Sequence, residues 1–486
     1  KRQMQEDFIT IRGERSKYMG ASGSYTIQPN GVTADNLTSD FFWKFAATDA
    51  AIAPLKNNTR QDYRDATRGF ADGYNRYMAE LKTGQYPGRH ADCAGKAWLL
   101  PITEDDMYRR YLRLSLIASS SVFINEIVNA APSLTGAGAS SPTAAQKIAA
   151  LQSRPVNPLL VLRSHLHFGS NMYALGKDAT ASGTPMLLGN PHFPWIGTER
   201  LYLTHLSIPS KNFDVMGGSL YGVPAVNIGF NDHFAWSHTV STAFRFTFYE
   251  LTLNPADPTQ YLYNGSFVPM TAVPVTIDVL GSDGTLTQQT RTLYRSQYGP
   301  MLVLTASGVP VLGWNRVKAY TLRDANAEND RLINQFAAWN SAQSLDEFIG
   351  LHKSILGIPW VNTTATGPGG KAYYGDVSVV PNVPDSEVQT CAAHPIHDVV
   401  QQLDAGLPVL DGSRTDCQWQ TDADAPAPGI FGGSHLPTLQ RDDYVKNSND
   451  SYWLTNPAAP LTGYNKIIGC ESCDIGLRPR LAILQV

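Results

Sequence analysis

The spacing of apolar residues changes character partway along the chain. Up to about residue 130, apolar residues recur three and four positions apart, as in RDATRGFADGYNRYMAEL (64–81) and EDDMYRRYLRLSLIASSSVFINEIV (104–128). This spacing is typical of amphipathic helices. From Ser170 onward, short apolar runs follow one another between Gly, Pro and Asn-Asp turns, which is typical of strands. The pattern therefore predicts a helical first part and a strand-rich remainder.

Within the remainder, a series of short runs are expected to be strands: NMYALG (171–176), PMLLG (185–189), LYLTHLSI (201–208), FDVMGGS (213–219), AVNIGF (225–230), HFAWSHTV (233–240) and FTFYELTL (246–253). Asn264-Gly265 marks a hairpin within TQYLYNGSFVPM. Helical spacing returns in NDRLINQFAAWNSAQSLDEFIGLHKSI (329–355). Because the strands lack regular βαβ spacing, we expect a sheet-on-sheet core covered by helices.

The segment between the two parts has a different composition. NAAPSLTGAGASSPTAAQKIAALQSRPVNP (129–158) is rich in Ala, Ser, Gly and Pro, which is typical of a loosely held spacer. The whole chain has 486 residues. That length indicates two or three packed units, or one large one.

Charge and hydropathy exclude two classes of protein. The formal net charge is -4, and no basic run or face stands out, so nothing indicates binding to nucleic acid. No stretch approaches the ~18 uninterrupted apolar residues of a membrane span. Charged residues make up only 16% of the chain, with Gly, Pro, Ser, Thr and Asn in their place. Soluble proteins average about 25% charged residues, so this share is low. A low share of charged residues with many small polar residues is common in extracytoplasmic proteins.

The cysteine pattern favours an oxidising compartment. Cys391 and Cys417 flank one loop-rich stretch, and we expect a disulfide between them. Cys470 and Cys473 form C-x-x-C, which is found in redox pairs and in half of a zinc site. A second C-x-x-C and a thioredoxin-like context are both missing from the sequence. The pairing of Cys93, Cys470 and Cys473 stays open.

Common catalytic motifs are missing from the sequence. It contains no G-x-S-x-G elbow, P-loop, H-E-x-x-H or dinucleotide fingerprint followed by a helix. His165 and His167 alternate as a metal-binding pair would, but no third ligand is evident. We therefore expect no cofactor and no metal.

Gly169-Ser170 stands immediately before the first expected strand, and by itself such a dipeptide is usually a turn. Cleavage between the two residues would give Ser170 a free α-amine beside its hydroxyl. An α-amine has a reference pKa of about 7.7–8.0, against roughly 10.4 for lysine. A serine at a new N-terminus thus carries its own general base, acting directly or through one water, and needs no His-Asp pair.

The region GSNMYALG…SGTPMLLGNPHFPW…ERLYLTHLSIP…FDVMGGSLYGVPAVNIGFNDHFAWSHTVST resembles the penicillin acylase family of N-terminal nucleophile (Ntn) hydrolases. In particular it resembles the acyl-homoserine lactone acylases and the aculeacin-type lipopeptide acylases. The likeness extends along nearly the whole chain through GERSKYMG, YGPMLVL, LRDANAEND, GIPWVNT, RDDYVKNSNDSYWLTNPAAPL and IGLRPR. The resemblance implies an α+β fold, the Ntn-hydrolase αββα sandwich, in which two packed antiparallel sheets are covered by helices.

The resemblance also implies a precursor. Residues 1–146 would form a mainly helical α subunit, 147–169 a spacer removed on maturation, and 170–486 the β subunit. The Ser170 hydroxyl would attack the Gly169 carbonyl and give an ester that water hydrolyses, and glycine suits the strained turn that this requires. Against the family, we expect that the first turn or two of helix and strand and a sizeable C-terminal part of the β subunit are absent.

Several site residues follow from the family's motifs. Ser170 would be the nucleophile, and the oxyanion would be held by the backbone N–H of Val240 and the side-chain amide of Asn449. Asn447 is the near alternative to Asn449 in the same motif. His192 would orient Ser170 or its amine, or tune the pKa of that amine. Arg478 would hold Asn449 or the α-amine region in place and help keep the amine neutral.

The acyl pocket is the other feature that the resemblance implies. The matching positions are Phe193, Leu220, Phe336, Trp360 and Val361. Phe336 stands where relatives also carry Trp, so the depth of the pocket stays open. Some penicillin G acylases bind calcium through aspartates just after the oxyanion strand. That segment here is STAFRFTFYE, without Asp, so we expect no ion there.

The predicted function is hydrolysis of the amide bond of N-acyl-homoserine lactones, which is a quorum-quenching activity. A cyclic lipopeptide or penicillin V acylase of the same mechanism is the alternative. A catalytically silent scaffold is disfavoured by the intact set of Ser170, His192, Asn449 and Arg478, and a metal-dependent lactonase by the lack of an H-x-H-x-D-H-like cluster. The expected partners are a small acyl amide and the second subunit from the same precursor, in the periplasm or outside the cell.

Overall fold

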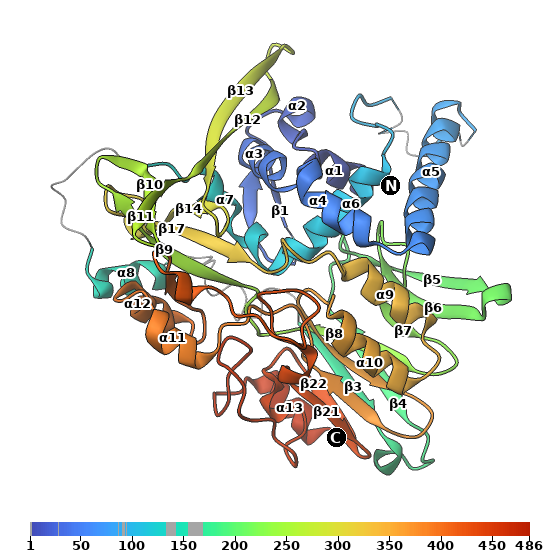
Figure 1. The fold of residues 1–486 in the computed structure, drawn as a ribbon. Coiled ribbons are helices and arrows are strands. Elements are labelled where there is room, and N and C mark those ends of the chain that lie inside the picture. The colour runs from blue at the N-terminus through green and yellow to red at the C-terminus, as the bar shows by residue number, and fades with distance from the viewer. Residues whose placement is uncertain are drawn as a thin grey trace.

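The computed structural model describes residues 2–27, 29–85, 87–89, 93, 95–132, 142–153 and 169–486. The first part is mainly helical, as the apolar spacing predicts, and its blue elements gather in the upper part of Figure 1. Its helices are α1 (Arg2–Ile11), α2 (Arg15–Met19), α3 (Asn36–Ala46), α4 (Asp49–Asn58), α5 (Gln61–Lys82), α6 (Glu104–Ser115) and α7 (Ile124–Val128). The short strands β1 (Ser24–Thr26) and β2 (Thr33–Asp35) pair beside them.

Local sequence explains why these helices form where they do. The buried residues of α5 recur every three or four positions and make one apolar stripe. At the start of α6, Thr103 and Asp106 form a capping box, each side chain accepting a hydrogen bond from the other's backbone N–H. On the buried face of α6, Arg110 and Arg113 pair with Asp7 of α1 at 2.6 and 2.8 Å. These pairs fix α6 against α1.

One expectation about the connecting segment is wrong. Residues 144–152, which we expected to be loosely held, form the helix α8 (Ala144–Gln152), whose N-terminus has a Thr143–Gln146 capping box. Leu151 is fully buried, and the Lys147 ammonium donates to the Val311 carbonyl at 3.0 Å. The capping box and the buried Leu151 outweigh the spacer-like composition. Of the expected spacer 147–169, residues 154–168 lie outside the described part of the chain.

Two antiparallel sheets in the lower half of Figure 1 carry the predicted strands. In the first, seven strands lie in the order β21 (Thr438–Arg441), β19 (Ala372–Gly375), β18 (Val361–Thr366), β8 (Ala235–Val240), β7 (Ile228–Phe230), β6 (Phe213–Leu220), β5 (Leu201–Ile208). In the second, three strands lie in the order β22 (Tyr444–Asn447), β3 (Ser170–Leu175), β4 (Met186–Pro191). Every run that we expected to be a strand from 171 to 240 is in one of them.

The two sheets pack face to face, with helices outside. Strands β3 and β4 contact β8, and Gly189 permits this approach, because a Cβ there would lie 2.8 Å from the Ser237 hydroxyl oxygen. On the other face of the seven-stranded sheet lie α9 (Leu332–Ser341) and α10 (Leu345–Ile355), where Phe348 packs on Trp236. Helix α13 (Leu477–Leu484) contacts β22 of the three-stranded sheet. The expected mixed fold of packed antiparallel sheets and helices is therefore confirmed.

A third sheet connects these layers to the helical part. Its main path is β11 (Ser266–Pro269), β10 (Asp257–Tyr263), β9 (Phe246–Asn254), β17 (Lys318–Asp324), β14 (Met301–Leu302), and β20 (Val409–Asp411) pairs in parallel with β9. The hairpin predicted at Asn264-Gly265 is confirmed, because β10 and β11 pair across these two residues, whose φ angles are 48° and 77°. Both angles are of the sign that a type I′ turn requires.

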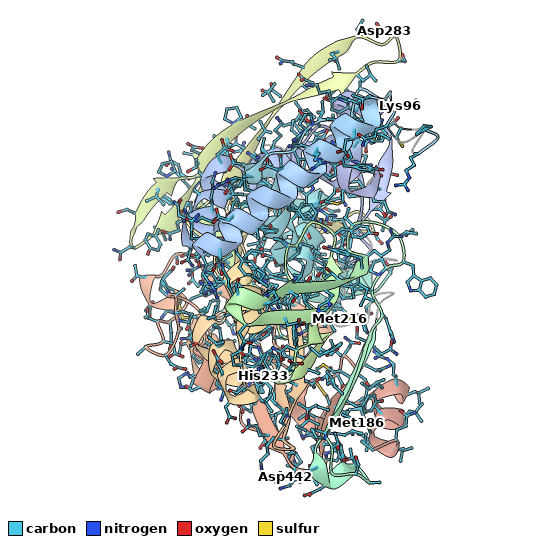
Figure 2. The ribbon with its side chains drawn as sticks, turned by 90° about the vertical axis from the view of Figure 1, so that its right-hand side faces the viewer. Lys96, Met186, Met216, His233, Asp283 and Asp442 are labelled. Atoms are coloured by element: carbon cyan, nitrogen blue, oxygen red, sulfur yellow. A yellow bond between two sulfur atoms is a disulfide. The ribbon has the colours of Figure 1, made fainter. Side chains whose placement is uncertain are left out.

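The remaining elements lie toward the periphery. They are the hairpin β12 (Thr271–Leu280) and β13 (Leu286–Arg295), the pair β15 (Leu304–Ala306) and β16 (Val309–Leu312), and the helices α11 (Asp385–Cys391) and α12 (Ile396–Leu403). Figure 2 shows Asp283, at the tip of the long hairpin, at the opposite end of the molecule from Met186 and Asp442. Within the described ranges, no single helix has the length and apolarity to cross a membrane, although the bent pair 104–118 and 120–128 meets the criterion by length and composition.

The cysteines form two disulfides. Cys391 and Cys417 are bonded, as expected, and this bond ties the end of α11 to the loop that follows β20. Cys470 and Cys473 are bonded as well, which settles the pairing that the sequence left open. Cys93 is buried and remains a free thiol.

Candidate active site

Ser170 is the first residue of β3, the central strand of the three-stranded sheet. It is 2% exposed and lies opposite Pro191, the last residue of β4. The chain then leaves the sheet, and the backbone N–H of His192 donates a hydrogen bond to the Ser170 hydroxyl oxygen at 3.2 Å. His192 thus lies beside Ser170, and the bond to Ser170 is made by its backbone.

Asn449 connects the nucleophile strand to β8. Its side-chain oxygen accepts a short hydrogen bond from the backbone nitrogen of Ser170, and its amide nitrogen donates to the Val240 carbonyl at 3.1 Å. Of the two predicted oxyanion donors, Asn449 thus contacts Ser170, and Val240 contacts Asn449 through its carbonyl oxygen. Asn447 lies behind Asn449 and accepts a hydrogen bond from its backbone N–H at 2.9 Å. Of the two asparagines, Asn449 is therefore the one in contact with Ser170.

Arg478 closes the site from the start of α13. Its guanidinium donates to the Ser170 carbonyl at 2.6 Å, to the Asn171 side chain at 2.9 Å and to the Asn449 side-chain oxygen at 3.0 Å. A Cβ at Gly169 would lie 2.7 Å from a guanidinium nitrogen, so only glycine fits beside Arg478 without a shift. A larger residue before Ser170 would thus push the Arg478 guanidinium away from these hydrogen bonds.

The electrostatics of the site favour a neutral imidazole at His192. Burial lowers the pKa of His192 below 6.5, and the positive charge of Arg478 lowers it further. The imidazole is therefore neutral near pH 7. Burial also lowers the pKa of Arg478, which the carboxylate of Asp450 opposes.

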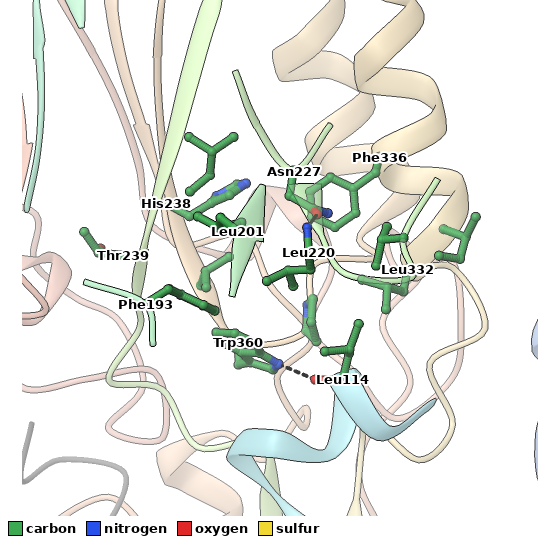
Figure 3. Close-up of a pocket in the computed structure, with 15 residues that line it drawn as sticks. Leu114, Phe193, Leu201, Leu220, Asn227, His238, Thr239, Leu332, Phe336 and Trp360 are labelled. Carbon is green, nitrogen blue, oxygen red and sulfur yellow. Dashed lines mark hydrogen bonds between the residues drawn. The ribbon is translucent and has the colours of Figure 1, made fainter. Parts of the chain in front are cut away.

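All five predicted acyl-pocket residues line one apolar cavity of about 60 Å³, shown in Figure 3. Phe193 stacks on Trp360 at a ring separation of 6.2 Å, and Phe336 reaches the cavity from α9. The cavity is small beside the roughly 300–1,000 Å³ of pockets for drug-sized ligands. A long acyl chain thus requires side chains to move.

Sequence reasoning missed the other residues of this cavity: Leu114, Leu201, Val223, Asn227, Ile228, His238, Thr239, Leu332, Ile333 and Pro359. Leu114 is the most informative, because it comes from α6 in the helical part and accepts a hydrogen bond from the Trp360 indole at 2.8 Å. No local motif marks it. Only the apolar period of α6 could have shown that it is buried.

His165 and His167 lie outside the described residues. Among the residues that are described, no three His, Cys, Asp or Glu side chains are placed to hold a metal ion.

One protein-family model matches nearly the whole chain. The penicillin amidase model matches residues 2–475, and the chain belongs to that family. The chain is 39% identical over 480 residues to the acyl-homoserine lactone acylase PvdQ of Pseudomonas putida, which covers 99% of this chain and 58% of that protein. It is 37% identical over 487 residues to the aculeacin-A acylase of Actinoplanes utahensis, with the same coverage of both chains.

The chain therefore spans 58% of the length of these two relatives. Among solved structures, the thermostable penicillin G acylase from Alcaligenes faecalis aligns with a TM-score of 0.46 at 19% identity, covering 62% of this chain and 47% of that one.

Proposed function

We propose that this protein is an amidohydrolase that uses Ser170 as an N-terminal nucleophile to release the fatty acid and the homoserine lactone from N-acyl-homoserine lactones. One observation carries the proposal: the hydroxyl and the nitrogen of Ser170 are held by His192 and Asn449 at the first residue of a strand. The apolar cavity is lined by Val361, which pairs with Val240 across β18 and β8, so the cavity lies next to the proposed oxyanion donors.

Maturation by self-cleavage is part of this proposal. The hydroxyl oxygen of Ser170 attacks the Gly169 carbonyl carbon, the C–N bond between the two residues breaks, and the hydroxyl proton ends on the freed amine. Water then hydrolyses the ester, which releases the Gly169 carboxylate and restores the hydroxyl. This cut gives residues 1–169 and the β subunit of 170–486. A second cut, after residue 146, excises the spacer of 147–169 and leaves the α subunit of 1–146, which stays with the β subunit as a heterodimer. The face-to-face sheets then form the αββα core of an Ntn hydrolase.

Turnover uses the same groups. The free α-amine of Ser170 accepts the hydroxyl proton, directly or through one water, as the oxygen attacks the substrate amide. The Val240 N–H and the Asn449 amide hold the developing oxyanion, and the charge of Arg478 keeps the amine neutral. The proton passes to the leaving lactone amine, and water then hydrolyses the acyl ester. His192 stays neutral and positions Ser170 through its backbone N–H.

The choice of substrate rests on the cavity and on two relatives. The cavity is apolar and suits an acyl chain, and each buried methylene contributes about 0.8 kcal/mol. The relative PvdQ is named an acyl-homoserine lactone acylase, which favours the lactone amides. The second candidate, a cyclic lipopeptide or penicillin V acylase, is favoured by the likeness to aculeacin-A acylase.

A competition between substrates tests this proposal. The protein is assayed with N-acyl-homoserine lactones of increasing chain length, with a cyclic lipopeptide and with penicillin V. We expect the highest kcat/KM with a lactone amide, and release of the free acid together with intact homoserine lactone. A higher kcat/KM with the lipopeptide or with penicillin V selects the second candidate, and opening of the lactone ring with the amide intact contradicts both.

We also propose a periplasmic or secreted location. The bonds Cys391–Cys417 and Cys470–Cys473 support it, since disulfides persist in oxidising compartments. Cell fractionation followed by thiol labelling tests it. The expected result is one reactive thiol per denatured chain, that of Cys93, in the extracytoplasmic fraction.

A further inference from the structure

The turn that carries Asn449 is built on a buried ion pair. Lys446, in β22, is fully buried, and its ammonium pairs with Asp450 at 2.8 Å; the Asp450 side chain is 9% exposed. Lys446 lies opposite Tyr173 of the nucleophile strand β3. Burying two charges costs several kcal/mol for each ion, so such a pair is weak evidence for stability. Its position in the turn that carries Asn449 points to another role.

The carboxylate of Asp450 has a second partner in the turn. Its other oxygen accepts a hydrogen bond from the backbone N–H of Ser448 at 2.8 Å. The Asn447 side chain donates to the Asp450 carbonyl at 3.0 Å and accepts from the Asn449 backbone N–H at 2.9 Å. Asn449 is thus enclosed by hydrogen bonds on both sides.

These bonds hold Asn449 in a left-handed conformation, which is uncommon outside glycine but is adopted by asparagine more readily than by most residues. Asn449 has a φ of 63°, in the left-handed region. A non-glycine residue persists there when the surroundings determine its conformation. The turn directs the Asn449 side chain at Ser170 and Val240, where an error of 1 Å in a catalytic group costs about 100-fold in rate.

We propose that Asp450 is a positioning residue for the reaction, which acts through Asn449 by holding the Ser448 N–H. Lys446 is the counter-charge that allows this carboxylate to be buried. The inference rests on the proposed function, because it assigns to Asp450 the alignment of the oxyanion donor. It predicts a requirement for a hydrogen-bond acceptor at position 450, whereas the charge itself is dispensable once Lys446 is also neutral.

Two charge-neutral variants separate the acceptor from the charge. Lys446→Met/Asp450→Asn removes both charges but keeps a side-chain oxygen for the Ser448 N–H. Lys446→Met/Asp450→Leu has the same charge without that oxygen. We expect the first to keep kcat within about 3-fold of the wild type. We expect the second to lose about 30- to 100-fold in kcat with KM within about 2-fold, together with slower cleavage before Ser170.

The controls distinguish positioning from folding. Thermal melting of each variant reports its fold, and Asp450→Ala replaces Asp450→Leu in the same background if the leucine variant does not fold. Asp443→Asn removes a paired carboxylate at the other end of β22, where Asp443 binds Arg441 at 2.8 Å, and should leave kcat unchanged. Equal kcat in the two double variants overturns the positioning role. A wild-type protein that hydrolyses no N-acyl amide contradicts instead the proposed function.

Discussion

Asn449 is the residue on which the geometry of the site depends most. It accepts from the Ser170 nitrogen and from Arg478, donates to Val240 and holds a left-handed backbone. A side chain with one oxygen and one NH₂ group is needed for this combination of bonds. In the proposed mechanism, the same amide donates to the oxyanion after it turns from the Val240 carbonyl to a bound substrate.

Asn449→Gly tests this role without straining the backbone, because glycine adopts positive φ freely. We expect kcat to fall about 10²- to 10³-fold, as for the loss of one oxyanion donor, with little change in KM. The melting temperature should fall as well, because the buried Ser170 N–H, the Val240 carbonyl and the Arg478 guanidinium each lose a partner. Asn264→Gly is the matched control, since Asn264 also has positive φ but lies in the β10–β11 hairpin. Loss of activity in both variants, or in neither, contradicts the assigned role.

At the same scale, the sequence predicted which residues gather at the site but not how they touch. The family motifs pointed to Ser170, His192, Asn449 and Arg478, and these four lie together. The motifs could not show that the bond from His192 to Ser170 comes from the backbone, because that follows from the end of β4 at Pro191. Leu114 was missed because only the folded chain brings α6 to Trp360.

At the scale of elements, the apolar cavity lies between α9 and the seven-stranded sheet. Phe336 reaches it from α9, while Trp360 and Val361 lie just before and at the start of β18. If the cavity binds the acyl chain as proposed, the size of the side chain at 336 sets how far that chain can enter.

Phe336→Val should shift the preference toward longer acyl chains, because it empties space in the cavity. Each additional methylene that becomes buried contributes about 0.8 kcal/mol, or about 4-fold in kcat/KM. Phe336→Trp should shift the preference toward shorter chains. The measurement is kcat/KM across a series of acyl lengths, with melting temperatures to follow the few kcal/mol that a core truncation costs. A preference that is the same in both variants contradicts this assignment of the cavity.

Elements with strong local signals were predictable, whereas their partners were not. The strands at 171–240 and the Asn264-Gly265 turn follow from alternation and turn chemistry. Helix α8 could not be predicted in this way, because its capping box and its one buried leucine lie among Ala, Ser and Pro residues that are typical of a spacer. The pairing of β8 with β18 places Val240 opposite Val361. Local sequence patterns carry no information about contacts between residues so far apart along the chain.

At the scale of the whole molecule, the layer between the seven-stranded sheet and its helices contains two buried histidines. His238 stacks on Trp339, and His352 donates to or accepts from the Tyr373 hydroxyl at 3.0 Å. Burial lowers the pKa of His238 to about 4 and that of His352 to about 3. Both rings are therefore neutral in the folded protein over most of the acid range.

This difference predicts a loss of stability in acid. The unfolded chain takes up protons at these histidines below about pH 6.5, whereas the folded protein does not, so the free energy of unfolding falls as the pH decreases toward 4. The slope is on the order of 1 kcal/mol per pH unit for each histidine. His352→Gln should make the dependence of stability on pH between 6.5 and 4 shallower than in the wild type. Equal slopes in the wild type and His352→Gln contradict the burial of a neutral ring.

We propose that the chain cuts itself before Ser170 and then uses that serine as its nucleophile. The most direct measurement is the intact mass and N-terminal sequence of the denatured protein, made on the wild type and on Ser170→Ala. We expect a wild-type fragment that begins Ser-Asn-Met-Tyr, and a Ser170→Ala chain that stays whole and inactive. A wild-type chain that is continuous across Gly169 and Ser170, or a Ser170→Ala chain that is still cut there, contradicts it.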